Sequence, residues 1–163
     1  MKEILFIFQI YLFKLINAEM HYICDNIYLG NSFAAKNESF LIENNIKAVV
    51  NCANEYTSEY NEIRFLELNL YDNIDEHLFP KFDVAYAFIK QNSKHNILIH
   101  CIEGRSRSVS LVIFYLMKEK RWDYDTCFEF IKKKNRFAYP NTGFQNQLKE
   151  YYNRYINKLQ FNL

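Results

Sequence analysis

Residues 100–108 include the side chains of this chain that are best suited to covalent chemistry. The segment reads His-Cys-Ile-Glu-Gly-Arg-Ser-Arg-Ser, so that Arg107 follows Cys101 by six positions. A thiolate is a strong nucleophile near neutral pH, and the planar fork of an arginine can hold two oxygens of one oxyanion. Gly104 permits a tight turn in which successive backbone N–H groups surround the same anion. The combination predicts that Cys101 attacks a phosphate held by Arg107.

Other side chains of this segment are expected to assist. Ser108 can hydrogen-bond the sulfur and ease its departure as a leaving group in a second step. The side chains of Glu103 and Arg105 are expected to point outward and to shape the rim. A cysteine and an arginine at this spacing are a weak signal alone, and a buried cysteine in an ordinary loop is the alternative. The residues predicted to surround the phosphate are Ile102, Glu103, Gly104, Arg105, Ser106 and Arg107.

The sequence on either side predicts the elements that hold this segment in place. Residues 96–100 form a short apolar strand, and apolar residues recur over 107–120 as in a buried helix. A strand, a tight loop and a helix start together direct backbone N–H groups and the positive end of the helix dipole at one anion. These flanks favour the catalytic interpretation over the ordinary loop.

Strands and helices alternate along the rest of the chain. Apolar patterns predict strands at 22–29, 47–52 and 63–70, and helices at 79–89, 124–134 and 143–159. This alternation predicts an α/β fold with helices packed on a sheet. Because ligands collect at the carboxyl ends of the strands in such folds, residues 101–108 lie where an anion site is expected.

Size, charge and cysteine spacing narrow the class of protein. The 163 residues suit one domain, which we expect to span 20–163, and the net charge of +1 gives no reason to expect nucleic acid as a partner. Four widely spaced cysteines form no zinc-binding pattern, so neither a metal nor another cofactor is expected. A catalytic thiol favours a reducing compartment, and we expect the cytoplasm.

The first 19 residues form a separate apolar segment. Positions 4–16 are almost wholly apolar but are interrupted by Gln9 and Lys14, and they are too few to span a membrane as a helix. Three interpretations stay open: a helix that packs on the domain or on a second copy of the chain, a signal or membrane anchor, and an unstructured extension. The first would give self-association through 1–19, and the second would make the protein membrane-associated or secreted.

Residues 100–108 resemble the His-Cys-x-x-Gly-x-Ser-Arg-Ser signature of dual-specificity phosphatases, which belong to the protein tyrosine phosphatase superfamily. Ile-Tyr-Leu-Gly-Asn at 27–31 and Asn-Ile-Lys-Ala-Val-Val-Asn at 45–51 resemble strands of that family. Tyr-Pro-Asn-Thr-Gly-Phe at 139–144 resembles its closing helix motif. The resemblance covers about 20–155 and implies a central mixed, mostly parallel sheet flanked by helices.

The resemblance also implies roles for residues outside the loop. A carboxyl group must protonate the leaving oxygen, and Asp72 directly follows a strand, as the acid of the family does. Asp75 is the alternative, although it suits a cap of the next helix better. His100 is implied to support the loop by hydrogen bonding. Cys52 ends a strand expected beside that of Cys101 and is a possible redox partner, unless it is simply a small buried residue.

The family implies hydrolysis of phosphotyrosine and of phosphoserine or phosphothreonine in protein substrates. No added segment suggests a deep slot that only phosphotyrosine could reach. Two other classes stay open: a phosphatase acting on lipid phosphates or RNA 5′ phosphates, and a phosphoprotein-binding module without catalysis. Glu103 adds negative charge to the loop, which argues against the former, and an intact Cys101 argues against the latter.

Overall fold

A computed structural model of the chain describes residues 17–55 and 60–156. Most of the apolar segment 1–19 lies outside the described residues, so the three interpretations of that segment stay open. The last residues of the helix expected at 143–159 lie outside them too. Within the described ranges, no helix has the length and apolar character needed to cross a membrane.

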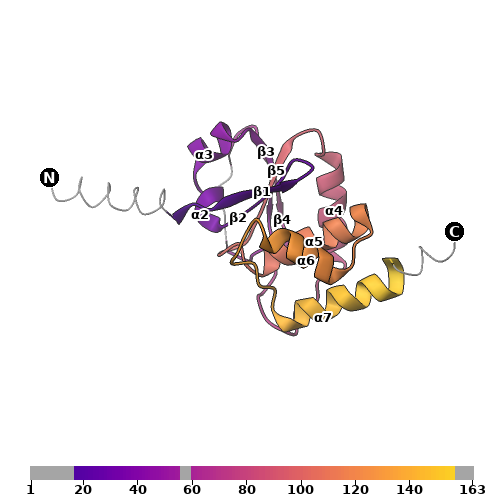
Figure 1. The fold of residues 1–163 in the computed structure, drawn as a ribbon. Coiled ribbons are helices and arrows are strands. Elements are labelled where there is room, and N and C mark those ends of the chain that lie inside the picture. The colour runs from indigo at the N-terminus through magenta and orange to yellow at the C-terminus, as the bar shows by residue number, and fades with distance from the viewer. Residues whose placement is uncertain (1–16, 56–59, 157–163) are drawn as a thin grey trace, which may run out of the picture.

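A five-stranded sheet forms the centre of the fold, in the order β1-β2-β5-β3-β4 (Figure 1). β1 pairs with β2 antiparallel, and the other three pairings are parallel. The predicted mixed, mostly parallel sheet is therefore confirmed. The strands are β1 Met20–Cys24, β2 Ile27–Gly30, β3 Ile46–Asn51, β4 Arg64–Glu67 and β5 Asn96–His100.

The single strand predicted at 22–29 is wrong, because the chain reverses direction within it. Asp25 and Asn26 adopt φ angles of 46° and 67°, and they join β1 to β2 in a tight hairpin. Asp and Asn tolerate this left-handed region better than most residues do. The turn does have a signal in the sequence, because the polar pair Asp25 and Asn26 interrupts the apolar residues at 22–24 and 27–29.

Helices cover both faces of the sheet (Figure 1). The predicted helices are present with ends displaced by a few residues, and the last one passes into a π-helical turn, η1. Two short helices, α2 and α3, pack near β5 and β3. The bounds are α2 Ser32–Ala35, α3 Glu38–Glu43, α4 Lys81–Gln91, α5 Arg107–Lys120, α6 Tyr124–Lys132, α7 Thr142–Tyr151 and η1 Tyr152–Ile156.

The helix α5 is the centre of the larger core. Each residue from Arg107 to Met117 is buried, because α5 lies on the sheet and is covered by α4, α6 and α7. Phe114 contacts the rings of Phe79, Phe82 and Tyr151 there. A helix that is buried on all sides cannot shift without disturbing the core. The loop between β5 and α5 is therefore fixed at its helical end.

The strand that leads into this loop is equally buried and ends at His100, which is 1% exposed. Its Nδ1 lies 3.2 Å from the carbonyl oxygen of Cys101, and within the described chain its Nε2 has no hydrogen-bond partner. Burial lowers the pKa of His100 from 6.5 to about 4. The imidazole is therefore neutral in the folded protein at neutral pH.

This buried histidine predicts a loss of stability in acid. Between pH 6.5 and 4 the unfolded chain binds a proton at His100 that the folded chain does not, so the free energy of unfolding falls as pH falls. His100 contributes a slope of at most about 1.4 kcal/mol per pH unit. Denaturant unfolding at several pH values should show a shallower dependence for His100→Asn than for the native chain. The exposed His95 supplies the control, because His95→Gln should keep the native slope; equal slopes in all three proteins would contradict the prediction.

Candidate active site

The loop from Cys101 to Ser106 is built around Gly104. This glycine has a φ of +67°, and a Cβ atom there would lie 2.7 Å from the carbonyl oxygen of Gly30 at the end of β2. Any side chain would therefore collide with the sheet as well as strain the backbone. Gly104 lets the loop curl tightly over the carboxyl end of the sheet.

Three carbonyl groups of the loop point at neighbouring segments. The backbone N–H of Ser32 donates to Ile102 O at 3.0 Å, Asn135 Nδ2 to Gly104 O at 2.9 Å, and the N–H of Tyr139 to Arg105 O at 2.7 Å. Across a trans peptide, each C=O and the following N–H point in opposite directions. The N–H groups of residues 103, 105 and 106 therefore point away from these partners and are available to an anion.

Cys101 lies in a cavity of about 290 Å³ at the amino end of α5. Its Sγ is 3.2 Å from Ser108 Oγ, and the residue is 2% exposed. The 14-residue helix directs partial positive charge toward this end. The residues that line the cavity are Glu55, Asp72, Cys101, Ile102, Glu103, Arg105, Ser106 and Arg107. The structure thus brings together most of the residues that the sequence predicts around the phosphate.

A backbone carbonyl group and a carboxylate hold Arg107 in the cavity. Its Nη1 donates to the carbonyl oxygen of Leu70 at 3.2 Å and lies 3.5 Å from a carboxylate oxygen of Glu55. Its Nε lies 3.9 Å from Asp72 Oδ2 and, within the described residues, has no hydrogen-bond partner. A buried guanidinium with an unused donor is suited to bind an anion. Sequence reasoning missed Glu55, whose neighbours in the chain gave no signal for this position.

Asp72 reaches the cavity from the loop after β4. Its Oδ1 accepts a hydrogen bond of 2.7 Å from Ser106 Oγ and one of 2.8 Å from Asn141 Nδ2. Asp75 does not line the cavity. The expectation that Asp75 caps the next helix is wrong, because α4 begins after Pro80. Of the two carboxyl groups considered, only Asp72 is placed next to Cys101 and Arg107.

Asn141 is a second residue at this site whose contacts the sequence did not reveal. Its Oδ1 caps α7 by accepting from the N–H of Phe144, its N–H donates to Ser106 Oγ, and its Nδ2 also donates to Asn73 O. A helix-capping role could be read from the sequence. The second role could not, since the amide group bonds a carboxylate 69 positions earlier in the chain.

Cys52 lies beside the nucleophile loop. Asn51 and His100 are paired in the parallel strands β3 and β5, and the N–H of Cys52 donates to His100 O at 2.8 Å. Burial and the neighbouring Cys101 raise the pKa of Cys52 well above its usual value. Burial also raises the pKa values of Cys24 and Cys127, to about 11 and about 12. These three cysteines are neutral thiols at neutral pH.

Metal binding has no candidate in the part of the chain that the structure describes. No group of three or more His, Cys, Asp or Glu side chains there could hold a metal ion.

Comparison with known proteins places this site in a family. Residues 27–154 match the family model described as dual specificity phosphatase, catalytic domain. The chain is 37% identical over 130 residues to a probable rhodanese domain-containing dual specificity protein phosphatase of Dictyostelium discoideum. It is 32% identical over 128 residues to dual specificity protein phosphatase 1B of Arabidopsis thaliana. These matches cover 78% and 77% of the chain.

The extent of the match differs between these relatives. It spans 77% of the Arabidopsis protein but only 27% of the Dictyostelium protein. Among solved structures, that of DUSP15 superposes with a TM-score of 0.81 at 27% identity, over 88% of this chain and 93% of that one. The chain therefore belongs to the dual specificity phosphatase family of the protein tyrosine phosphatase superfamily.

Proposed function

We propose that this protein hydrolyses phosphotyrosine and phosphoserine or phosphothreonine in protein substrates through a cysteinyl-phosphate intermediate. The observation that carries the proposal is the presence of Cys101, Arg107 and Asp72 in one cavity at the amino end of α5. Membership in the family supports both the reaction and the substrate class.

In the first step, Cys101 Sγ attacks phosphorus in line with the leaving oxygen. The S–P bond forms, the bond from phosphorus to the leaving oxygen breaks, and Asp72 gives that oxygen its proton. Asp72 Oδ1 already accepts two hydrogen bonds, so Oδ2 is the oxygen that carries the proton. Arg107 and the loop N–H groups of residues 102–107 hold the phosphoryl oxygens.

In the second step, water attacks the cysteinyl phosphate. Asp72 accepts a proton from the water, and the S–P bond breaks to release Cys101 as a thiolate. The hydroxyl of Ser108, 3.2 Å from the sulfur, stabilises the negative charge that develops there. His100 supports the loop in both steps through its contact with the carbonyl oxygen of Cys101.

The rim of the cavity favours protein substrates over the two alternatives. Glu103 adds negative charge beside Arg105, and Glu55 adds it beside Arg107, which disfavours the several phosphates of an inositol lipid or an RNA end. A module that only binds phosphoproteins would not need the acid Asp72 beside the nucleophile. A phosphatase acting on lipid or RNA 5′ phosphates stays the second candidate.

We also propose that Cys52 protects the nucleophile from overoxidation. Peroxide oxidises the Cys101 thiolate to a sulfenic acid; the Cys52 thiol then attacks that sulfur, forms the S–S bond and releases water. Neighbouring strands lie about 4.8 Å apart, a spacing that a disulfide can bridge. The pairing of β3 with β5, which leads directly into both cysteines, supports this.

The compartment, the catalytic domain and the partners of the enzyme are inferred from the same chemistry. A nucleophilic thiol works in a reducing compartment, so we infer the cytoplasm as its location. We assign catalysis to a domain of 20–163, with phosphoproteins as its partners. Self-association through 1–19 is a separate proposal that rests on the apolar sequence of that segment.

Replacing the nucleophile tests the proposed reaction. Cys101→Ser should lower turnover of p-nitrophenyl phosphate by more than about a thousandfold, because a serine hydroxyl is not ionised here. Binding of a phosphotyrosine peptide, measured by calorimetry, should persist. Cys24→Ser is the matched control and should keep its activity. A native protein that binds phosphopeptides but turns over no aryl phosphate would be a binding module.

Asn141 tests the assignment of Asp72. Asn141→Asp keeps a side chain that caps α7 but replaces the amide donor to Asp72 by a second carboxylate. Repulsion between the two carboxylates should displace Asp72 from the leaving oxygen, so protonation of that oxygen should suffer. We expect kcat/KM for phenyl phosphate, a poor leaving group, to fall about tenfold, and that for p-nitrophenyl phosphate to change much less. Asn37→Asp makes the same change at the cap of α3 and should alter neither substrate. Equal losses on both substrates would indicate damage to the fold instead.

Peroxide treatment tests the role of Cys52. After brief exposure to hydrogen peroxide, dithiothreitol should restore most of the native activity, since a disulfide is reducible and a sulfinic acid is not. Cys52→Ser should recover several times less. Mass spectrometry should detect a peptide pair that joins Cys52 to Cys101 in the native protein only. Equal recovery in both proteins would exclude the protective disulfide.

A further inference from the structure

A second hollow, of about 420 Å³, lies beside the phosphate cavity. We call it the flanking hollow. It shares Ile102, Glu103 and Arg105 with the phosphate cavity, so these loop residues form a ridge between the two spaces. The rest of its lining is Asn17, Glu19, Asn31, Phe33 and Phe137. Because the two spaces adjoin, the neighbours of a phosphorylated residue in the phosphate cavity lie within reach of the flanking hollow.

Phe137 is an exposed aromatic ring that its surroundings hold in place. It is 43% exposed, yet its N–H donates to Asn135 Oδ1 at 3.0 Å and its carbonyl oxygen accepts from Arg105 Nε at 3.2 Å. The guanidinium of Arg136 lies 4.7 Å from the ring centroid. Asn135 also donates to Gly104, which ties the segment to the phosphate loop. The backbone of Phe137 is thus fixed to the phosphate loop, and its ring offers exposed apolar surface beside that loop.

The charges at this hollow are largely compensated. Arg105 and Glu103 form an ion pair of 3.4 Å on the ridge, and Glu19 is the remaining carboxylate of the lining. An acidic side chain would meet Glu19, and the described lining holds no cation other than Arg105, which is paired with Glu103. An apolar side chain would instead cover Phe137, Phe33 and Ile102 and remove their surface from water. The lining therefore fits a large apolar group.

We propose that the flanking hollow binds a large apolar side chain, such as leucine or phenylalanine, that stands one or two positions from the phosphorylated residue of a protein substrate. An extended peptide advances about 3.3 Å per residue, so a near neighbour of the phosphorylated residue crosses the ridge. The inference rests on the proposed phosphatase activity, and it gives that activity a sequence preference.

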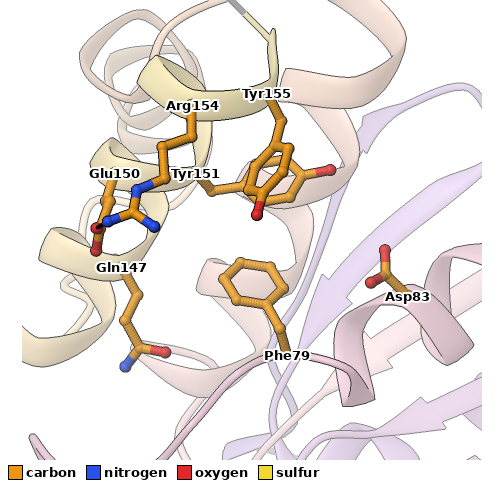
Figure 2. A pocket seen from close by; sticks show the side chains of 7 residues that line it. All are labelled: Phe79, Asp83, Gln147, Glu150, Tyr151, Arg154 and Tyr155. Atoms are coloured by element: carbon orange, nitrogen blue, oxygen red, sulfur yellow. Dashed lines mark ion pairs between the residues drawn. The ribbon is translucent and has the colours of Figure 1, made fainter.

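A larger hollow, of about 530 Å³, is a poor candidate for the same role. It lies between the start of α4 and the helices α7 and η1, where Phe79 stacks on Tyr151 (Figure 2). Tyr155 and the ion pair of Glu150 and Arg154 complete this side of the hollow. It shares no lining residue with the phosphate cavity. Tyr155 is 57% exposed and offers a matched aromatic residue for a control.

The test uses phosphotyrosine peptides that differ at one position. Alanine peptides with a single leucine, lysine or glutamate at −2, −1, +1 or +2 should show the highest kcat/KM for leucine at one of these positions. Phe137→Ala should reduce that advantage about fivefold, which corresponds to about 1 kcal/mol, and Phe137→Leu should retain part of it. Both variants should hydrolyse p-nitrophenyl phosphate at the native rate, and Tyr155→Ala should keep the native peptide preference.

The outcomes separate this inference from the proposed function. A native protein without turnover of any aryl phosphate would refute the phosphatase assignment itself. Turnover without a leucine preference, or with a preference that Phe137→Ala leaves intact, would refute the subsite alone. If Phe137→Ala instead accelerated all peptides equally, the hollow would be occupied by another part of this chain, and the inference would again be overturned.

Discussion

The close contact of Gly104 with the end of β2 is the constraint on which the rest of the site depends. It fixes a loop whose two ends are already immobile, because β5 and α5 are both buried. The carbonyl groups of the loop find partners in three separate segments, at the start of α2, after α6 and before α7. These three hydrogen bonds set the orientation of the loop N–H groups. The geometry of the anion site therefore depends on segments that do not touch the anion themselves.

The acid loop depends on a different part of the chain, the start of α7. A Cβ atom on Gly143 would lie 2.1 Å from the carbonyl oxygen of Ile74, so the acid loop rests directly on the helix backbone. Gln147 adds hydrogen bonds to the backbone of Leu78 and Glu76. The nucleophile loop and the acid loop are thus held in place by different parts of the chain. The two loops are joined by the hydrogen bonds among Ser106, Asp72 and Asn141.

The sequence was sufficient to predict the parts of this arrangement that are local. The strand, loop and helix around Cys101 follow from apolar periodicity and from one glycine, and the mixed parallel sheet agrees with the family resemblance. The hairpin at Asp25 and Asn26 was missed, although this polar pair interrupts the apolar residues and is typical of a turn. Asn141 and Glu55 were missed for a physical reason: their roles depend on contacts between segments distant in sequence, which periodicity does not report.

The ion pair between Arg107 and Glu55 has a consequence for the catalytic cycle. The carboxylate lies 3.5 Å from the same guanidinium that a phosphate must engage. An incoming phosphate therefore meets a guanidinium whose charge is already partly balanced at Nη1, while its Nε has no hydrogen-bond partner among the described residues. The carboxylate lowers the apparent affinity for substrate and for product phosphate by the same factor, because it reduces the fraction of Arg107 that is ready to bind either of them. Both ligands therefore leave the cavity sooner than they would without Glu55.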